Sequence, residues 1–69
     1  MTMYNSFQIR YRKGDKNHVF QSPLWKNGDA SQRLIAERQT EINKTNMNRA
    51  GARVVELNVI RIPGPPNNE

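Results

Sequence analysis

The residues of this chain that are best suited to do chemistry are arginines and lysines. Arg10, Arg12, Lys13 and Lys16 follow one another closely near the N-terminus, and Arg61 lies near the C-terminus. An arginine guanidinium can engage a carboxylate or a phosphate through two hydrogen bonds, whereas a lysine ammonium acts as a point charge. These five residues therefore predict a surface that binds an anionic partner.

Other residue types are too sparse, or spaced wrongly, for catalysis or metal binding. His18 is the only histidine and cysteine is absent, so a zinc site would lack ligands. Glu37 and Glu41 stand four residues apart, a spacing typical of solvated charges on a helix. The four glycines are isolated and form no phosphate-binding loop. We therefore expect a protein that is not an enzyme and that holds no cofactor and no metal.

The basic residues alternate with apolar ones, which predicts a β-strand over residues 6–13. Successive strand side chains point to opposite faces. Apolar residues share one face: Phe7, Ile9 and Tyr11. Polar and basic residues share the other: Gln8, Arg10 and Arg12. One face is thus expected in the core and the other in contact with a partner.

Composition indicates a small basic domain with a thin core. The 69 residues are 35% hydrophobic, and the net charge is +5. A domain of this size buries only about 60% of the surface that its unfolded chain exposes. No apolar run approaches the roughly 20 residues that span a bilayer, and the N-terminus lacks the pattern of a signal peptide. Together with the absence of cysteine, this predicts a cytoplasmic protein without membrane contact.

The remaining elements follow from turn and cap signals. Residues 13–17 predict a hairpin turn into a strand at 18–22, which Pro23 ends. Trp25 is expected to cover one end of the core. Asp29 is a typical N-cap for a helix from residue 30 to about 44. The last strand, residues 53–62, changes its alternation near Val59, which indicates either a β-bulge, the reading we favour, or a strand covered on both faces.

Assembled, these elements predict an α+β fold of the order β-β-α-β, with a three-stranded, mostly antiparallel sheet and one helix on one face. The domain spans residues 1–62, and residues 63–69 form a flexible tail rich in Pro, Gly and Asn. The helix is expected to bury an apolar stripe of Ala30, Leu34, Ile35 and Ile42. The predicted core comprises Phe7, Ile9, Tyr11, Leu34, Ile35, Ile42, Val55, Leu57 and Val59. The open sheet face carries Arg10 and Arg12, joined by Arg53 or Arg61 according to the position of the bulge.

Three kinds of function fit this pattern. The first is docking on an acidic surface of a protein or ribonucleoprotein complex. The second is a small nucleic-acid-binding regulator that contacts the DNA or RNA phosphate backbone. The third is an accessory subunit that completes its core on assembly. Tyr11 belongs to the core face, so it is not expected to stack on bases, and the oligomeric state is left open.

The order of elements, with a last strand ending in residues 56–63 (ELNVIRIP), resembles small phage-encoded host-takeover proteins. These include the coliphage inhibitor family that binds bacterial RNA polymerase, and small anti-CRISPR proteins. In the polymerase-inhibitor family, closely spaced arginines at the end of the last strand contact the polymerase. Here only Arg61 occupies a similar place, beside Ile60 and Ile62. The resemblance implies a small phage-type inhibitor or modulator that acts by binding a host or defence complex.

Overall fold

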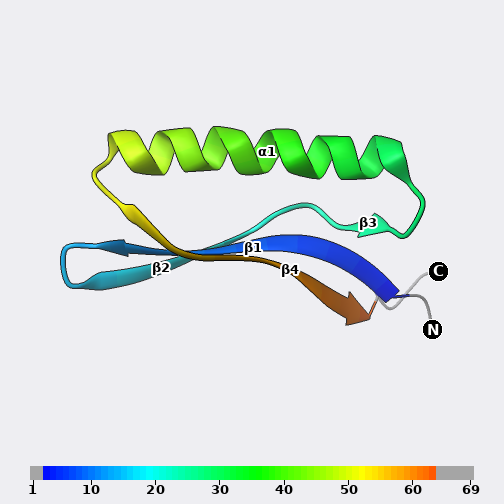
Figure 1. Cartoon of the computed structure of the whole chain (residues 1–69), viewed down its shortest axis with the longest axis horizontal. Coiled ribbons are helices and arrows are strands. Elements are labelled where there is room, and N and C mark those ends of the chain that lie inside the picture. The colour runs from blue at the N-terminus through cyan, green and yellow to red at the C-terminus, as the bar shows by residue number, and fades with distance from the viewer. Residues whose placement is uncertain (1–2, 64–69) are drawn as a thin grey trace.

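One long helix lies lengthwise across one face of an antiparallel sheet (Figure 1). The computed structural model describes residues 3–63. Its elements are β1 (Met3–Lys13), β2 (Lys16–Gln21), β3 (Trp25–Lys26), α1 (Ala30–Arg49) and β4 (Arg53–Pro63). The predicted α+β fold is confirmed, with four strands instead of three. The additional strand is the two-residue β3.

β1 is the central strand of the sheet. β4 pairs along one edge of β1, from Met3 opposite Pro63 to Arg12 opposite Arg53. β2 and β3 pair with the two ends of the other edge, so they lie in line and the sheet stays three strands wide. Ser22 bridges the gap between them, because its Oγ accepts a hydrogen bond from the Phe7 amide at 2.8 Å. Pro23, which has no amide hydrogen, follows at the break.

A two-residue turn at Gly14 and Asp15 joins β1 to β2. Gly14 has a φ of +62°, the conformation that glycine supplies at the first position of a type II′ hairpin turn. Pairing therefore begins at once, with Lys13 opposite Lys16. The predicted hairpin is confirmed, but β2 starts two residues before the expected residue 18.

The core is smaller and more polar than the apolar pattern predicts. Its buried apolar residues are Ile9, Tyr11, Trp25, Ala36 and Ala52. Buried polar residues accompany them: Asn5, Ser6, Ser22 and Thr40. Phe7 is partly buried and packs on Trp25 with ring centroids 4.9 Å apart, so Trp25 closes one end of the core as predicted.

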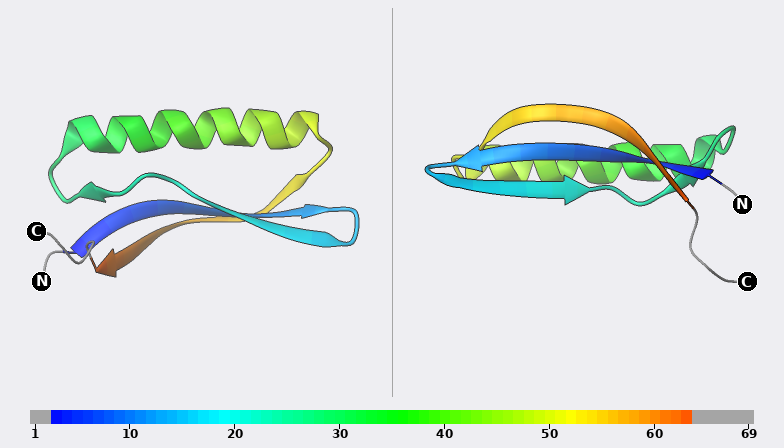
Figure 2. Two further views of the ribbon diagram at one scale, coloured as in Figure 1. Left: turned by 180° about the vertical axis from the view of Figure 1, so that it is seen from behind. Right: turned by 90° about the horizontal axis from the view of Figure 1, so that it is seen from below.

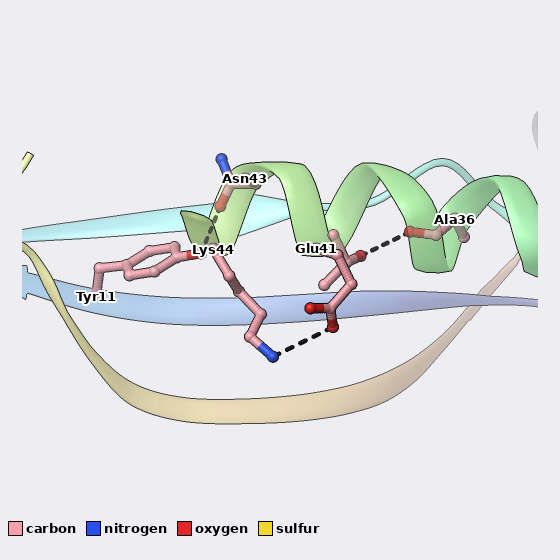
Figure 3. Close-up of polar contacts among 6 residues, drawn as sticks. Tyr11, Ala36, Glu41, Asn43 and Lys44 are labelled. Carbon is pink, nitrogen blue, oxygen red and sulfur yellow. Dashed lines mark hydrogen bonds and ion pairs between the residues drawn. The ribbon is translucent and has the colours of Figure 1, made fainter. Parts of the chain in front are cut away.

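α1 turns a different face to the sheet from the one predicted. Its N-cap is as expected, since the Asp29 carboxylate accepts a hydrogen bond from the backbone amide of Gln32 at 3.0 Å. The buried helix residues, however, are Ala36 and Thr40, and the Thr40 hydroxyl turns back to donate to the Ala36 carbonyl at 2.8 Å. About one helical turn after Thr40, Asn43 accepts a hydrogen bond from the Tyr11 hydroxyl of β1 (Figure 3).

The predicted apolar stripe of the helix is therefore wrong. Leu34, Ile35 and Ile42 are 45%, 46% and 55% exposed, and Ala30 is exposed as well. Small side chains at Ala36 and Thr40 let the helix backbone approach β1, which the bulkier residues of the apolar stripe would prevent. The helix also runs on to Arg49, beyond the expected end near residue 44.

β4 contributes less to the core than predicted. Leu57 and Val59 pair with Ile9 and Phe7, yet they remain 45% and 54% exposed. Figure 2 (right) shows the reason, because the helix lies behind β1 and β2 while β4 bows away from it. A register irregularity between Arg10 and Tyr11 leaves Val55 without a partner, so the bulge lies at Val55 and not near Val59.

The end of β4 also differs from the expected boundary. Pro63, predicted as the first residue of the tail, is the last residue of β4 and lies opposite Met3. A proline is tolerated at the end of an edge strand because its missing amide hydrogen breaks no further pairing. The rest of the predicted tail, residues 64–69, lies outside the described residues.

We expect the Leu34→Ala substitution to change the free energy of unfolding by no more than about 0.5–1 kcal/mol. The side chain is almost half exposed, and the higher helix propensity of alanine offsets part of the lost packing. Urea denaturation followed by circular dichroism measures the effect. A loss above about 2 kcal/mol, as a core leucine would show, would contradict this placement of the helix.

Candidate partner-binding surface

The sheet face that turns away from the helix carries a mixed basic and apolar surface beside the hairpin turn. We call it the open-face patch and define it as Arg10, Arg12, Val19, Arg53 and Val55. Residues that stand directly opposite each other in antiparallel strands project to the same face. Arg12 stands opposite Arg53, and Arg10 stands opposite Val19, which brings residues of β1, β2 and β4 together.

Like charges face each other at two positions of this end of the sheet. Arg12 is opposite Arg53 on the open face, and Lys13 is opposite Lys16 beside the turn. Directly opposed like charges destabilise a sheet. The ion pairs found within residues 3–63 use Arg10, Arg33 and Lys44, so these four cations have no carboxylate partner in the described part of the chain. Such unrelieved positive charge is suited to an external anion.

Arg10 differs from its neighbours because its charge is already engaged. Its guanidinium lies 2.6 Å from the Glu56 carboxylate across the β1–β4 pair. The other carboxylate oxygen of Glu56 accepts a hydrogen bond from the side-chain amide of Asn58 at 2.8 Å. Exposed ion pairs of this kind contribute about 0–1 kcal/mol. Arg10 therefore lies in the patch as predicted, but Arg12 and Arg53 supply its free positive charge.

The bulge at Val55 adds an apolar feature beside these arginines. Val55 and Val19 line a shallow depression of about 180 Å³ together with Arg10 and Asn17. The two valines are 56% and 64% exposed, so their methyl groups face solvent. The patch thus offers apolar contact next to cationic groups.

The five predicted binding residues do not gather on one surface. Arg10 and Arg12 share the open face, and Lys13 and Lys16 flank the turn at its end. Arg61 pairs with Asn5, which projects to the same face of β1 as the helix-facing residues Phe7 and Ile9. Arg61 therefore lies on the other side of the sheet, towards its opposite end, and the structure does not bring it to the patch.

The sequence reasoning missed the two valines and left Arg53 as one of two options. The signal for Val19 was available, because the two-residue turn at Gly14 and Asp15 places Val19 opposite Arg10. The assignment of Arg53 required the bulge at Val55, which no local pattern locates. The depression depends on that same bulge.

Three further observations bear on the function. Residues 3–63 contain no cluster of three or more His, Cys, Asp or Glu side chains that could hold a metal ion. Within the same residues, the helix is not long and apolar enough to cross a membrane. Comparison with family models, curated proteins and solved structures gives no significant match. The geometry of this chain is therefore the basis for inferring its function.

Stability is expected to fall above pH 10 through Tyr11. Burial raises the pKa of the Tyr11 phenol above its ordinary value of 10.0. As the pH rises past that value, the unfolded chain releases the phenolic proton before the folded chain does. The free energy of unfolding, which has its full value at lower pH, therefore falls. Urea denaturation between pH 8 and pH 11 should show a steeper loss for the natural chain than for Tyr11→Phe. Tyr4→Phe is the matched control, and an equal slope in all three would contradict the expectation.

Proposed function

We propose that this protein is a non-enzymatic binding module that docks through the open-face patch onto an acidic surface of a protein or ribonucleoprotein complex. The observation that carries the proposal is the pairing of Arg12 with Arg53 beside two exposed valines. Opposed arginines reduce folding stability unless an anion lies between or above them. A carboxylate-bearing partner relieves that repulsion through paired hydrogen bonds to the guanidinium groups.

The valines favour a protein surface over a nucleic-acid backbone. A phosphate backbone is bound through charge and hydrogen bonds, and exposed methyl groups add nothing to that contact. Protein interfaces, by contrast, combine an apolar centre with a polar rim in which arginine is enriched. Val19 and Val55 beside Arg12 and Arg53 reproduce that composition on a small scale.

The same proposal extends to the kind of protein this is and the compartment in which it acts. The order of elements supports a small phage-type inhibitor or modulator, which blocks a host or defence complex by occupying its surface. The absence of cysteine supports the cytoplasm as its compartment. Net positive charge would speed the encounter with an acidic complex, and added salt would slow it.

A double variant, Val19→Ser with Val55→Ser, distinguishes a protein partner from nucleic acid. The partner is first captured from nuclease-treated lysate and purified, and its affinity for the natural chain is then measured. Losing two partly exposed valines should weaken binding about thirtyfold, since each contributes roughly 1 kcal/mol when it becomes buried. Leu34→Ser, on the outer face of the helix, is the matched control and should leave the affinity unchanged.

The opposite set of results would support the nucleic-acid alternative. In that case nuclease would abolish capture, and the double valine variant would bind duplex DNA or RNA as tightly as the natural chain does. The logarithm of that affinity would fall linearly with the logarithm of salt concentration. Either result is clear, because the two variants differ from the natural chain only in exposed apolar groups.

A further inference from the structure

The outer edge of β4 is long and apolar and has little protection against pairing. Between the bulge at Val55 and Arg61, residues 56–60 present unpaired backbone groups on an edge strand. Leu57 and Val59 flank this edge on the helix side and are about half exposed. The one charge in the stretch, Glu56, is drawn inward by Arg10 and Asn58. Edge strands of monomeric proteins are usually protected by charge, proline or bulges, and this stretch has none of them at its centre.

The opposite edge of the sheet is protected. It consists of β2 and β3, which are interrupted by Ser22, Pro23 and Leu24. β2 is polar along most of its length (KNHVFQ) and carries a lysine at its start. The contrast indicates that the β4 edge, and not the sheet edge in general, is suited to pairing.

We infer that residues 56–60 of β4 pair antiparallel with the same residues of a second copy of this chain, about a two-fold axis at Asn58. In this register Leu57 stands opposite Val59 of the second copy, and Glu56 stands opposite its Ile60. The stretch is thus complementary to itself, as a two-fold interface requires. The four half-exposed side chains of Leu57 and Val59 would form one apolar cluster on the helix side of the joined sheet.

The bulge at Val55 and the charge of Arg61 favour this register over its neighbours. Faces match only when the register moves in steps of two residues. An axis at Leu57 would place the bulged Val55 opposite Val59 of the second copy and interrupt the pairing there. An axis at Val59 would place the apolar Leu57 opposite the charged Arg61 of the second copy. With the axis at Asn58, the paired residues 56–60 stop short of the bulge, and their one charged residue, Glu56, faces the uncharged Ile60.

The dimensions of the chain favour a second copy as the occupant. The radius of gyration is 13.4 Å, against about 11 Å expected for a compact domain of this length. The elongated shape, 41 Å by 21 Å by 17 Å, leaves the apolar residues of β4 uncovered. Pairing two β4 strands would supply the missing apolar contacts and place two open-face patches on one side of the joined sheet. This inference stands apart from the proposed function, because dimerisation does not need the partner.

Sedimentation equilibrium of the full chain tests the dimer directly. The average mass should rise with concentration from 8.0 kDa towards twice that value. Val59→Arg should weaken association at least tenfold, because it places two like charges close to the axis. Val19→Arg, at an exposed site on β2, is the matched control and should dimerise like the natural chain. A mass that stays at that of one chain at every concentration, or a Val59→Arg variant that associates as well as the natural chain, would overturn the inference.

A cross-linking experiment tests the register without destabilising the fold. A residue on the two-fold axis stands opposite the same residue of the second copy. The two Cα atoms are then about 4.5–5.5 Å apart, a separation that suits a disulfide. The chain has no cysteine, so Asn58→Cys under mild oxidation should give a covalent dimer. Gln21→Cys on β2 is the control and should remain monomeric. Equal cross-linking of both variants would show random collision and refute the register.

Discussion

Replacing Ile9 with alanine is expected to lower the free energy of unfolding by about 2–5 kcal/mol, which would leave much of the chain unfolded. Ile9 is fully buried at the centre of β1, between Phe20 of β2 and Leu57 of β4. A chain of this length has a total stability of roughly 3–10 kcal/mol. The substitution would leave a cavity at this position, and because few other apolar side chains are buried, little can move in to fill it.

Urea denaturation at a single chain concentration measures this effect, since any dimer would contribute to the apparent stability. Val19→Ala removes methyl groups from an exposed valine and should cost less than about 0.5 kcal/mol. If Ile9→Ala does not fold, Ile9→Val gives a graded reading of about 0.5–1.5 kcal/mol. Equal effects at Ile9 and Val19 would mean that the core lies elsewhere.

The Arg12→Glu, Lys16→Glu double variant is expected to lose at least about 100-fold in affinity for the partner while becoming slightly more stable. Each substitution places a glutamate opposite a cation, Arg53 or Lys13, and converts a repulsive cross-strand pair into an attractive one worth about 0.2–1 kcal/mol. The same glutamates would meet the acidic surface of the partner as like charges. Two contacts of about 1.4 kcal/mol each correspond to the expected loss.

Thermal unfolding and the affinity for the purified partner are measured on the same preparation. Arg38→Glu with Arg61→Glu is the matched control, because it changes the net charge equally at sites outside both the patch and the adjoining β1–β2 turn. A rise in melting temperature with loss of binding in the first variant alone would support the open-face patch together with the adjoining turn. Loss of binding in the control would instead move the site to the helix face or to Arg61. A first variant that binds as tightly as the natural chain would remove the patch from consideration.

Local chemistry by itself determined the elements of this protein apart from the two-residue β3. Alternation of apolar and basic residues predicted β1, the residues around Gly14 predicted the hairpin, and Asp29 predicted the start of the helix. Each of these features depends on side chains a few residues apart, whose preferences act before any distant contact forms. The same alternation placed Arg10 and Arg12 on one face, which the structure confirms.

Only the tertiary structure decided which surfaces are buried and which residues meet across the sheet. The helix period identified Leu34, Ile35 and Ile42 as an apolar stripe, but close approach to β1 required the small face at Ala36 and Thr40. Apolar residues outside the core are common, so periodicity alone does not show which face is buried. The bulge at Val55 likewise depends on pairing with β1, and it alone brings Arg53 to Arg12 and leaves Arg61 on the other side.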